Sequence, residues 1–429
     1  MASALFLAAL AAPVMSGTAT HGGAVAGAQI VRVSSLADAG PGSLRGAVQQ
    51  AGPKVIVFDV GGVIDLASDL KISIPNTTIA GQSAPAPVTL TGGSLRIRAN
   101  DVVVQHIAVR PGPGATPEVN VNRDALTIGG GKRPVRDIRV ENVSLSWALD
   151  EGASIGGGAS NVTFRNSIVA ESLSNAGHPK GRHSMGMLIN NDNQAVAVTG
   201  NLFAANMYRN PVIARGGSVF VGYNLIVDPG RNAIHFYDAA GATPLRVSLV
   251  GNVVQPGSDT AGKVTAVLIP ETMAAKLPDA SLYVSQNRMA QGALANPGDF
   301  PLAERPPVGI SDKYAAAGNV GAAVLRDAGA RPAARDAVDA RIVSQAAQGT
   351  IRIIDDPAEV GGLPPSAPVH NAAAVPANPF DVSGRSDLLR IEAWLCQRHR
   401  EVGGPATPEC PGAAQDYRNL LQLRLTERR

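Results

Sequence analysis

Asparagine recurs six times at an apparently equivalent position of a short repeated pattern. Each time it follows one short β-type run and precedes another short apolar run. The positions are Asn142, Asn166, Asn201, Asn224, Asn252 and Asn287, and His106 holds the equivalent place in VVVQHIAV. Successive positions are 36, 24, 35, 23, 28 and 35 residues apart. A strand-and-turn unit that recurs with variable inserts is the signature of a solenoid.

Asparagine suits the turn between two strands because it tolerates the left-handed backbone conformation and bonds to nearby backbone groups. Stacked coil over coil, the side chains could also hydrogen-bond along a ladder. The repeat therefore predicts an all-β fold, a single-stranded right-handed parallel β-helix with coils from about residue 55 to about residue 290. We expect these asparagines to be structural and to take no part in chemistry.

The 429 residues would suffice for several ordinary domains, but solenoid coils contact only their neighbours, which favours one elongated domain. We expect a leader at 1–28, the β-helix at 29–300 and a C-terminal extension at 301–429 that packs on the solenoid. The segment at 41–50, PGSLRGAVQQ, predicts a short helix with Ser43 as its N-cap. This helix would cover the open end of the solenoid.

The extension carries two further helical patterns, at 334–348 and 386–401, and between them a proline-rich stretch, 364–380, that we expect to lie extended on the solenoid. Cys396 and Cys410 could form one disulfide or remain two free thiols, and their spacing does not decide between these states.

The first residues form an apolar run that is too short to span a bilayer. Small-residue patterns at 24–26 and 26–28 resemble signal-peptide cleavage sites, so we expect a secreted or periplasmic protein. Aromatic residues make up only 4% of the chain, which disfavours stacking of neutral sugars, and the formal charge of +3 suits an acidic ligand. We expect a monomer with no nucleic-acid and no membrane partner.

Two carboxylates, Asp124 and Asp150, fall on adjacent coils in the register of the repeat. Oxygen ligands from neighbouring coils could hold a hard cation such as calcium, although each carboxylate could instead cap a turn. Glu151 follows Asp150 directly, and on a strand the two side chains would point to opposite faces. The sequence therefore predicts that only one of these two acids is a ligand.

Cationic residues gather in the neighbouring stretches: Lys180 in an insert, and Arg209 and Arg215 around the start of a later coil. Cations beside a metal site make sense if an anionic substrate lies between them and the metal. His178 and His183 flank Lys180 but lack a third ligand with the spacing of a zinc site.

Several motifs occur in a fixed order: DAGPGSLRGAVQQAGPKVIVFDVGGVIDL, TIAGQSAP, RDALTI, SLSWALDEG, HPKGRH, RNP and DAVDARIVSQAAQGTIRIIDDPAEVGG. Together they resemble the bacterial pectate lyases of polysaccharide lyase family 1, over roughly residues 30 to 364. The resemblance implies a right-handed parallel β-helix that cleaves polygalacturonate by β-elimination with calcium.

The resemblance also implies roles for single residues. Arg209 matches the catalytic base of an R-x-P motif, Lys180 and Arg215 match residues that bind substrate carboxylates, and Asp124 and Asp150 match calcium ligands. The chain departs from the family at Asn122 and Ser154, where acids are expected. A site with fewer carboxylates should hold calcium more weakly.

Two other hypotheses about the function remain open. An inverting glycoside hydrolase would use Asp124 and Asp150 as its two opposed carboxylates. A β-helical protein that binds an acidic polysaccharide without cleaving it would account for the reduced number of acids. The scaffold alone does not separate these functions from a lyase.

Overall fold

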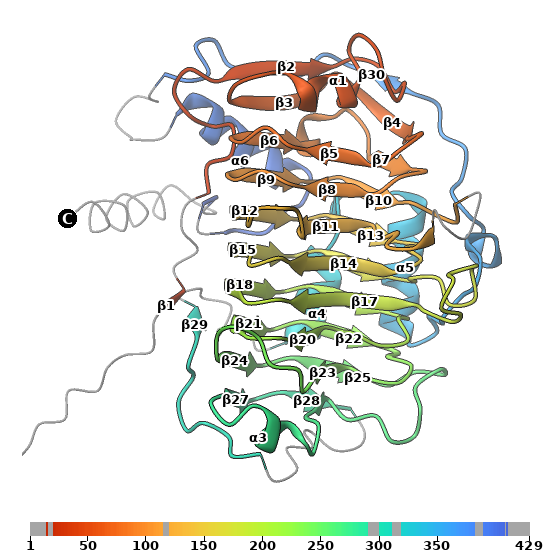
Figure 1. Ribbon diagram of the computed structural model, residues 1–429. Coiled ribbons are helices and arrows are strands. Elements are labelled where there is room, and N and C mark those ends of the chain that lie inside the picture. Colours follow the sequence, from red (N-terminus) through yellow and green to blue (C-terminus); the bar gives the residue numbers. More distant parts are fainter. Residues whose placement is uncertain are drawn as a thin grey trace, which may run out of the picture.

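The computed structural model describes residues 14–15, 20–114, 120–290, 300–310, 319–381, 389–407 and 409–410. Its strands form three long sheets that wind around one axis, and each complete coil contributes one strand to each sheet (Figure 1). All neighbours within the coils pair in parallel. The predicted right-handed parallel β-helix is confirmed.

The first sheet contains β2 (Gln29–Val33), β3 (Lys54–Phe58), β6 (Thr77–Ala80), β9 (Val102–Gln105), β12 (Arg136–Glu141), β15 (Ser160–Arg165), β18 (Asn193–Thr199), β21 (Gly217–Gly222), β24 (Leu245–Val250) and β27 (Ser281–Ser285). The second contains β4 (Val60–Asp65), β7 (Val88–Thr91), β10 (Ala108–Arg110), β13 (Ser144–Ser146), β16 (Ile168–Ala170), β19 (Leu202–Ala204), β22 (Leu225–Val227), β25 (Val253–Gln255), β28 (Arg288–Met289) and the antiparallel β30 (Val369–His370).

The third sheet contains β5 (Leu70–Ile72), β8 (Leu95–Ile97), β11 (Leu126–Gly129), β14 (Glu151–Gly156), β17 (Met185–Asn190), β20 (Val212–Ala214), β23 (Ile234–Phe236) and β26 (Val267–Leu268). Outside the coils, β1 (Val14–Met15) pairs with β29 (Gly309–Ile310). The α-helices are α1 (Leu44–Gln49), α3 (Met273–Lys276), α4 (Val320–Asp327), α5 (Ala337–Gln348) and α6 (Arg390–Glu401), and 3-10 turns lie at Gly81–Ser83 and Pro357–Val360.

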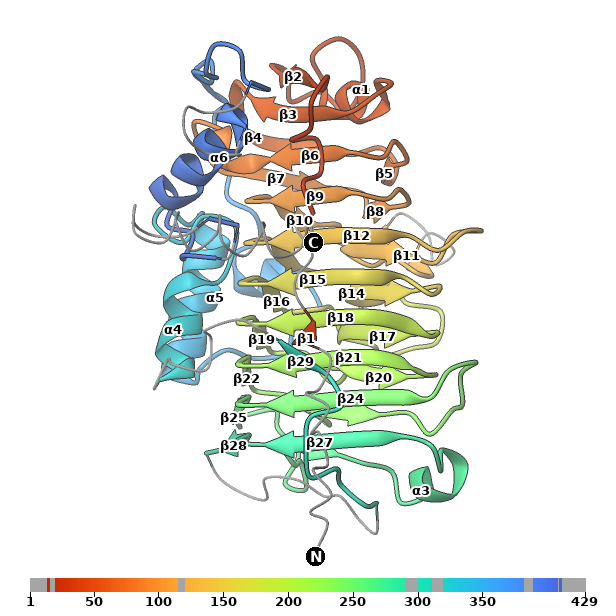
Figure 2. The ribbon, with the colours of Figure 1, turned by 90° about the vertical axis from the view of Figure 1, so that its left-hand side faces the viewer.

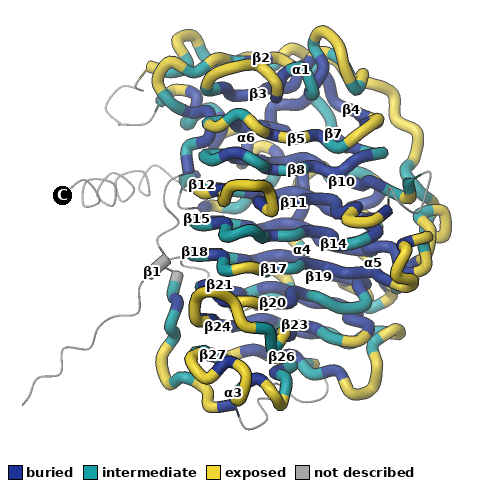
Figure 3. The backbone as a smooth tube through the Cα atoms, viewed as in Figure 1, coloured by how far each residue is buried: buried dark blue, intermediate teal, exposed yellow. Residues whose placement is uncertain are grey.

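One continuous apolar core fills the interior of the coils, visible as the buried strands of Figure 3. It consists mainly of valine, isoleucine and leucine, whose branched side chains pack well between pleated strands. The solenoid begins earlier than the expected residue 55, because β2 pairs in parallel with β3 and so belongs to the first coil. The reason is that the insert between these strands holds α1, which interrupts the repeat pattern.

The prediction that all six asparagines occupy equivalent positions in the repeat is wrong. Strand pairing places Glu141 level with Arg165 and Arg165 level with Thr199. Asn142 and Asn166 therefore stand one position before the other four asparagines. The four that share a position donate from one coil to the next: Asn201 to Asn224 at 2.9 Å, Asn224 to Asn252 at 2.9 Å and Asn252 to Asn287 at 2.8 Å.

This shift also reassigns the left-handed turn. Asn142 and Asn166 adopt positive φ themselves, but in the later coils the residue before the asparagine does so: Gly200, Tyr223, Gly251 and Gln286. The ladder asparagines instead serve as buried hydrogen-bonding groups. Ser167 continues the ladder upward, since its hydroxyl accepts from the Val143 amide and its own amide donates to Asn201.

The predicted capping helix is present as α1. The Ser43 side chain accepts a hydrogen bond from the Gly46 amide, and Leu44, Ala47 and Val48 are buried against the first coils. This satisfies a free amide at the helix start and covers the apolar end of the solenoid.

The C-terminal part of the chain packs along the outside of the coils. Figure 2 shows α4 and α5 lying along one side of the solenoid, where they cover apolar side chains that point outward from the second sheet. Arg110, fully buried on β10, forms ion pairs with Asp336 and Asp339, both at 2.7 Å. Asp336 is also the N-cap of α5.

The predicted helices at 334–348 and 386–401 are confirmed as α5 and α6. The proline-rich stretch is extended, as predicted, and β30 within it pairs antiparallel with β4. Residues 1–13 and 16–19 of the expected leader lie outside the described residues. Residues 20–28 pack on the body, with Ala24 buried against Val55 and Leu395. No helix in the described part of the chain has the length and apolarity needed to cross a bilayer.

Candidate functional site

Three carboxylates meet on the outside of the third sheet. Asp124 lies two residues before β11, and Glu151 opens β14 on the next coil. Because Leu126 pairs with Ala153, Asp124 and Glu151 are level with one another. Together with Asp150, they bring carboxylate oxygens within 4.8 Å of one another. The prediction that Asp124 and Asp150 lie on adjacent coils is confirmed.

The backbone around Arg123 holds two of these acids in place. The Arg123 side chain donates to the carbonyls of Gly92, Pro111 and Gly112, which fixes the segment that leads into β11. The Arg123 carbonyl in turn accepts the amides of Leu149 and Asp150. The bend before β14 is thereby tied to the neighbouring coil.

The expectation that Asp150 and Glu151 point to opposite faces is wrong. Glu151 is the first residue of β14, whereas Asp150 lies in the bend that precedes the strand. Alternation of side chains applies only within an extended strand. Both carboxylates therefore reach the same cluster, which makes Glu151 the acid that sequence reasoning missed.

The cluster concentrates negative charge in a buried place. Burial and the charge of Asp150 raise the pKa of Asp124 to about 7, although hydroxyl groups of Ser154 and Thr127 partly oppose this by hydrogen bonding. Ser154, which stands where an acid was expected, thus lowers the pKa of Asp124 rather than adding a charge to the cluster. A cation bound here would relieve the repulsion between the carboxylates.

Arg209 lies in the turn before β20 and reaches across β17 to Glu151. One guanidinium nitrogen donates to the Glu151 carboxylate in a short ion pair. The approach depends on Gly186 in β17, because a Cβ there would lie 2.5 Å from the Arg209 carbonyl oxygen. Arg209 itself has φ of 63°, an uncommon backbone state for a residue with a side chain.

Two tyrosines flank the Arg209 guanidinium. Its carbon lies 5.6 Å from the Tyr208 ring centre and 5.7 Å from that of Tyr237, and its Nε donates to the Tyr237 hydroxyl at 3.2 Å. Cation–π contacts of this kind favour the charged side chain. His235 lies beside both rings, and burial lowers its pKa to about 4, so it adds no positive charge here at neutral pH.

Lys180 is exposed on a tight turn at the rim of the cluster, where the Gly181 amide donates to the His178 carbonyl. The His178 and His183 rings stack with centroids 3.4 Å apart, and His183 Nε2 lies 3.6 Å from an Asp150 oxygen. The fold therefore brings Asp150 to the two histidines as a neighbour that their sequence spacing did not reveal.

Arg215 stands apart from these residues. It follows β20, whereas Arg209 precedes that strand, so the length of the strand separates them. Its side chain is exposed, and within the described ranges it forms no ion pair. The structure thus brings together Asp124, Asp150 and Arg209, with Lys180 at the rim, but leaves Arg215 outside the cluster.

The fold and the cluster together define a parallel β-helix protein with an acidic site opposed by an arginine on one sheet. Over 235 residues the chain is 37% identical to a probable pectate lyase C of Aspergillus flavus, covering 54% of this chain and 51% of the relative. A probable pectate lyase C of Aspergillus fumigatus is 35% identical with the same coverage. The chain thus spans about half the length of the curated relatives it matches.

No protein-family model matches the chain. Among solved structures, a pectate lyase bound to a hexasaccharide covers 70% of this chain and 92% of its own, with 14% identity and a TM-score of 0.49. The major allergen from cedar pollen covers 65% and 82%, with 19% identity and a TM-score of 0.49. The similarity to pectate lyases is supported, but the named relatives are fungal and give no support to a specifically bacterial resemblance.

Proposed function

We propose that this protein is a pectate lyase of polysaccharide lyase family 1 that cleaves α-1,4-linked polygalacturonate by β-elimination. The observation that carries the proposal is the placement of Arg209 against three clustered carboxylates on one sheet. The similarity to probable pectate lyases over half of the chain supports it. An acidic polysaccharide is the substrate class, because cations at the site suit carboxylates.

The acidic cluster fits a calcium ion. Its donors are carboxylate oxygens, which are the ligands that calcium prefers, and burial together with the charge of Asp150 raises the pKa of Asp124. Asp124, Asp150 and Glu151 would hold the ion. Bound calcium would neutralise charge on the substrate carboxylate.

Arg209 is proposed as the base that removes the proton at C5 of a galacturonate. The carbon lies beside a carboxylate, so negative charge builds up there while the oxygen at C4 leaves. In the structure the Arg209 guanidinium is engaged by the Glu151 carboxylate. Glu151 must therefore release Arg209 before the proton is transferred, which makes Glu151 part of the proposed machinery.

Lys180 and Arg215 are proposed to bind carboxylates of the chain-like substrate. Lys180 is exposed at the rim of the cluster, where it can reach a sugar next to the reacting one. Arg215 lies beyond β20, so its partner would be a more distant sugar of the same polymer. A polymer with carboxylates on several units could engage both residues.

The inverting hydrolase is less well supported. Inverting glycosidases separate their two carboxyl groups by roughly 6.5–9.5 Å to leave room for a water molecule. Here the carboxylate oxygens lie within 4.8 Å of one another, and one acid is engaged by an arginine. The similarity to probable pectate lyases does not favour a protein that binds the polysaccharide without cleaving it.

We also propose that the protein is exported and acts as a monomer, with a leader within 1–28, a catalytic β-helix at 29–300 and an extension at 301–429.

The test is the ultraviolet absorbance of the new C4–C5 double bond when the full chain is mixed with polygalacturonate and calcium. We expect absorbance to rise with calcium and to stop when a chelator is added. New reducing ends without the absorbance would favour the hydrolase. Tight binding without either product would favour the binding protein.

A further inference from the structure

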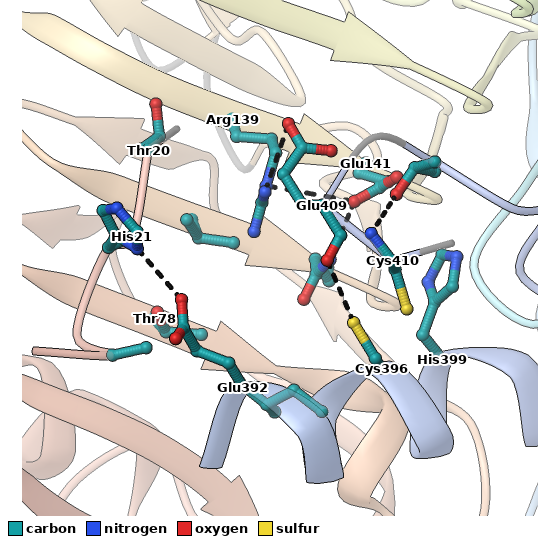
Figure 4. Close-up of a pocket in the computed structure, with 15 residues that line it drawn as sticks. Thr20, His21, Thr78, Arg139, Glu141, Glu392, Cys396, His399, Glu409 and Cys410 are labelled. Atoms are coloured by element: carbon teal, nitrogen blue, oxygen red, sulfur yellow. Dashed lines mark hydrogen bonds and ion pairs between the residues drawn. The ribbon is translucent and has the colours of Figure 1, made fainter. Parts of the chain in front are cut away.

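A polar cavity of about 40 Å³ lies far from the candidate site, where the C-terminal segment meets the first sheet (Figure 4). Its walls come from β9 and β12, from residues 20–24, from α6, and from Thr407, Glu409 and Cys410. Carboxylates, an arginine and two thiols line it. The proposed function uses none of these groups.

The Glu409 carboxylate compensates positive charge in the wall of this cavity. Its carboxylate pairs with Arg139 at 3.4 Å and, more closely, with Arg165. Arg165 also pairs with Glu141 at 2.8 Å, and both of these side chains are only 2% exposed. The two arginines and two glutamates balance, so loss of Glu409 would leave a buried excess of positive charge.

Glu409 lies between Thr407 and Cys410, whose backbone groups bond to each other. The Thr407 amide donates to the Cys410 carbonyl at 3.1 Å, and the Cys410 amide returns a bond to the Thr407 carbonyl at 3.0 Å. The Cys410 amide also approaches the Thr407 hydroxyl at 3.1 Å. The turn is fixed within itself, but these bonds do not attach it to the solenoid.

The Glu409 ion pairs attach this turn to the solenoid, and the Cys396 thiol adds a contact with α6. Cys396 lies on α6, which is anchored to the coils through Ile391 and Leu395. Its thiol donates to the Glu409 carbonyl at 3.2 Å, so it lies beside the residue that precedes Cys410, and both cysteines line the same cavity. Both cysteines are buried, and the chain contains no others, so one pairing is available.

We propose that Cys396 and Cys410 are oxidised to a disulfide that fixes the Glu409 turn to α6. With a small disulfide such as oxidised glutathione, the Cys396 thiolate attacks one sulfur, the glutathione S–S bond breaks, one glutathione thiolate leaves and a mixed disulfide forms. The Cys410 thiolate then displaces glutathione. Two thiols lose two protons and two electrons, and one glutathione disulfide is reduced to two glutathione thiols.

The disulfide would stabilise the folded protein through the ion pairs of Glu409. It closes a short loop and so restricts the unfolded chain, and in the folded state it holds Glu409 against Arg165. This inference does not rest on the proposed lyase function, because no residue of the candidate site takes part.

The direct test folds the full chain in a glutathione redox buffer, then denatures and alkylates it with and without prior reduction. We expect an intact mass with no alkyl groups before reduction and two after it. Cys396→Ser should accept one alkyl group or carry one glutathione, which calibrates the assay. Two alkyl groups on the unreduced wild type would overturn the proposal.

A second measurement tests the link to Glu409. Reduction should lower the thermal midpoint of the wild type by about 5 °C, in line with the loss of a disulfide that closes a short loop. In Glu409→Gln the same reduction should have a clearly smaller effect, because the turn no longer delivers a charge. An equal decrease in both proteins would contradict the role assigned to Glu409.

Discussion

Arg209 and Glu151 form an ion pair across an intervening strand. Glu151 opens β14 and Arg209 lies in the turn before β20, and β17 lies between these two strands. The same Glu151 carboxylate belongs to the acidic cluster with Asp124 and Asp150. One side chain therefore faces both the proposed base and the proposed calcium ligands. Competition for this carboxylate links the two parts of the site.

Glu151→Gln should weaken calcium binding at least tenfold, because affinity follows the number of charged ligands. The same change removes the carboxylate that pairs with the Arg209 side chain, so the rate at saturating calcium should be retained or increased. Calorimetry of calcium binding and initial rates on polygalacturonate would measure both effects. Asp65→Asn, which changes an acid outside the site, is the control, and unchanged calcium affinity in Glu151→Gln would count against the ligand role.

His235 should make the protein less stable in acid. Its pKa is about 4 when folded and near 6.5 when unfolded, so the unfolded chain binds more protons between these values. Its contribution is therefore complete above pH 6.5 and falls as pH decreases, by up to about 3 kcal/mol at pH 4. Urea unfolding of the wild type and His235→Gln at pH 7 and pH 4.5 would check this, and the expected result is a shallower decrease in the variant.

The buried pair of Arg110 and Asp339 should be essential for attachment of the extension. Arg110→Met leaves Asp339 buried and without its closest cation, which should destabilise the protein by about 3–5 kcal/mol. Arg326→Met is the matched control, because its ion pair with Asp327 involves an arginine side chain that is 70% exposed. Similar urea midpoints for the two variants would show that the buried pair has no special role.

The asparagine ladder should respond to loss of a single member. Asn224→Ala removes the acceptor for the Asn201 amide and the donors to Val198 and Asn252, all of them buried. Unsatisfied buried groups cost about 1–3 kcal/mol each, so the free energy of unfolding should fall by about 3 kcal/mol. Chemical denaturation measures this change, and a loss below that of an exposed Asn378→Ala would contradict a structural ladder.

The fold could be predicted from the sequence because each coil repeats the same local pattern of apolar strands and turns. The helices α1, α5 and α6 were also predictable, since Ser43 and the apolar spacing mark them locally. The register of the repeat was harder to predict. Asn142 and Asn166 fit the repeat by residue type, and only strand pairing shows that they precede the ladder position.

The site could be predicted in part. The adjacency of Asp124 and Asp150 follows from counting coils, whereas the role of Glu151 depends on where β14 begins, which residue types do not define. The Arg209 backbone packs close to Gly186, and a missing side chain on an intervening strand gives no distinct sequence signal. A glycine directly after Met185 in an otherwise apolar strand was the one available hint.

The most direct test of the central claim is the mass of the products formed from polygalacturonate in water labelled with heavy oxygen. Elimination through Arg209 predicts a new non-reducing end that is lighter by one water molecule, and a new reducing end that is initially unlabelled, both lost in Arg209→Ala. Prompt incorporation of heavy oxygen at the new reducing end, with no lighter product, would show hydrolysis and contradict the account.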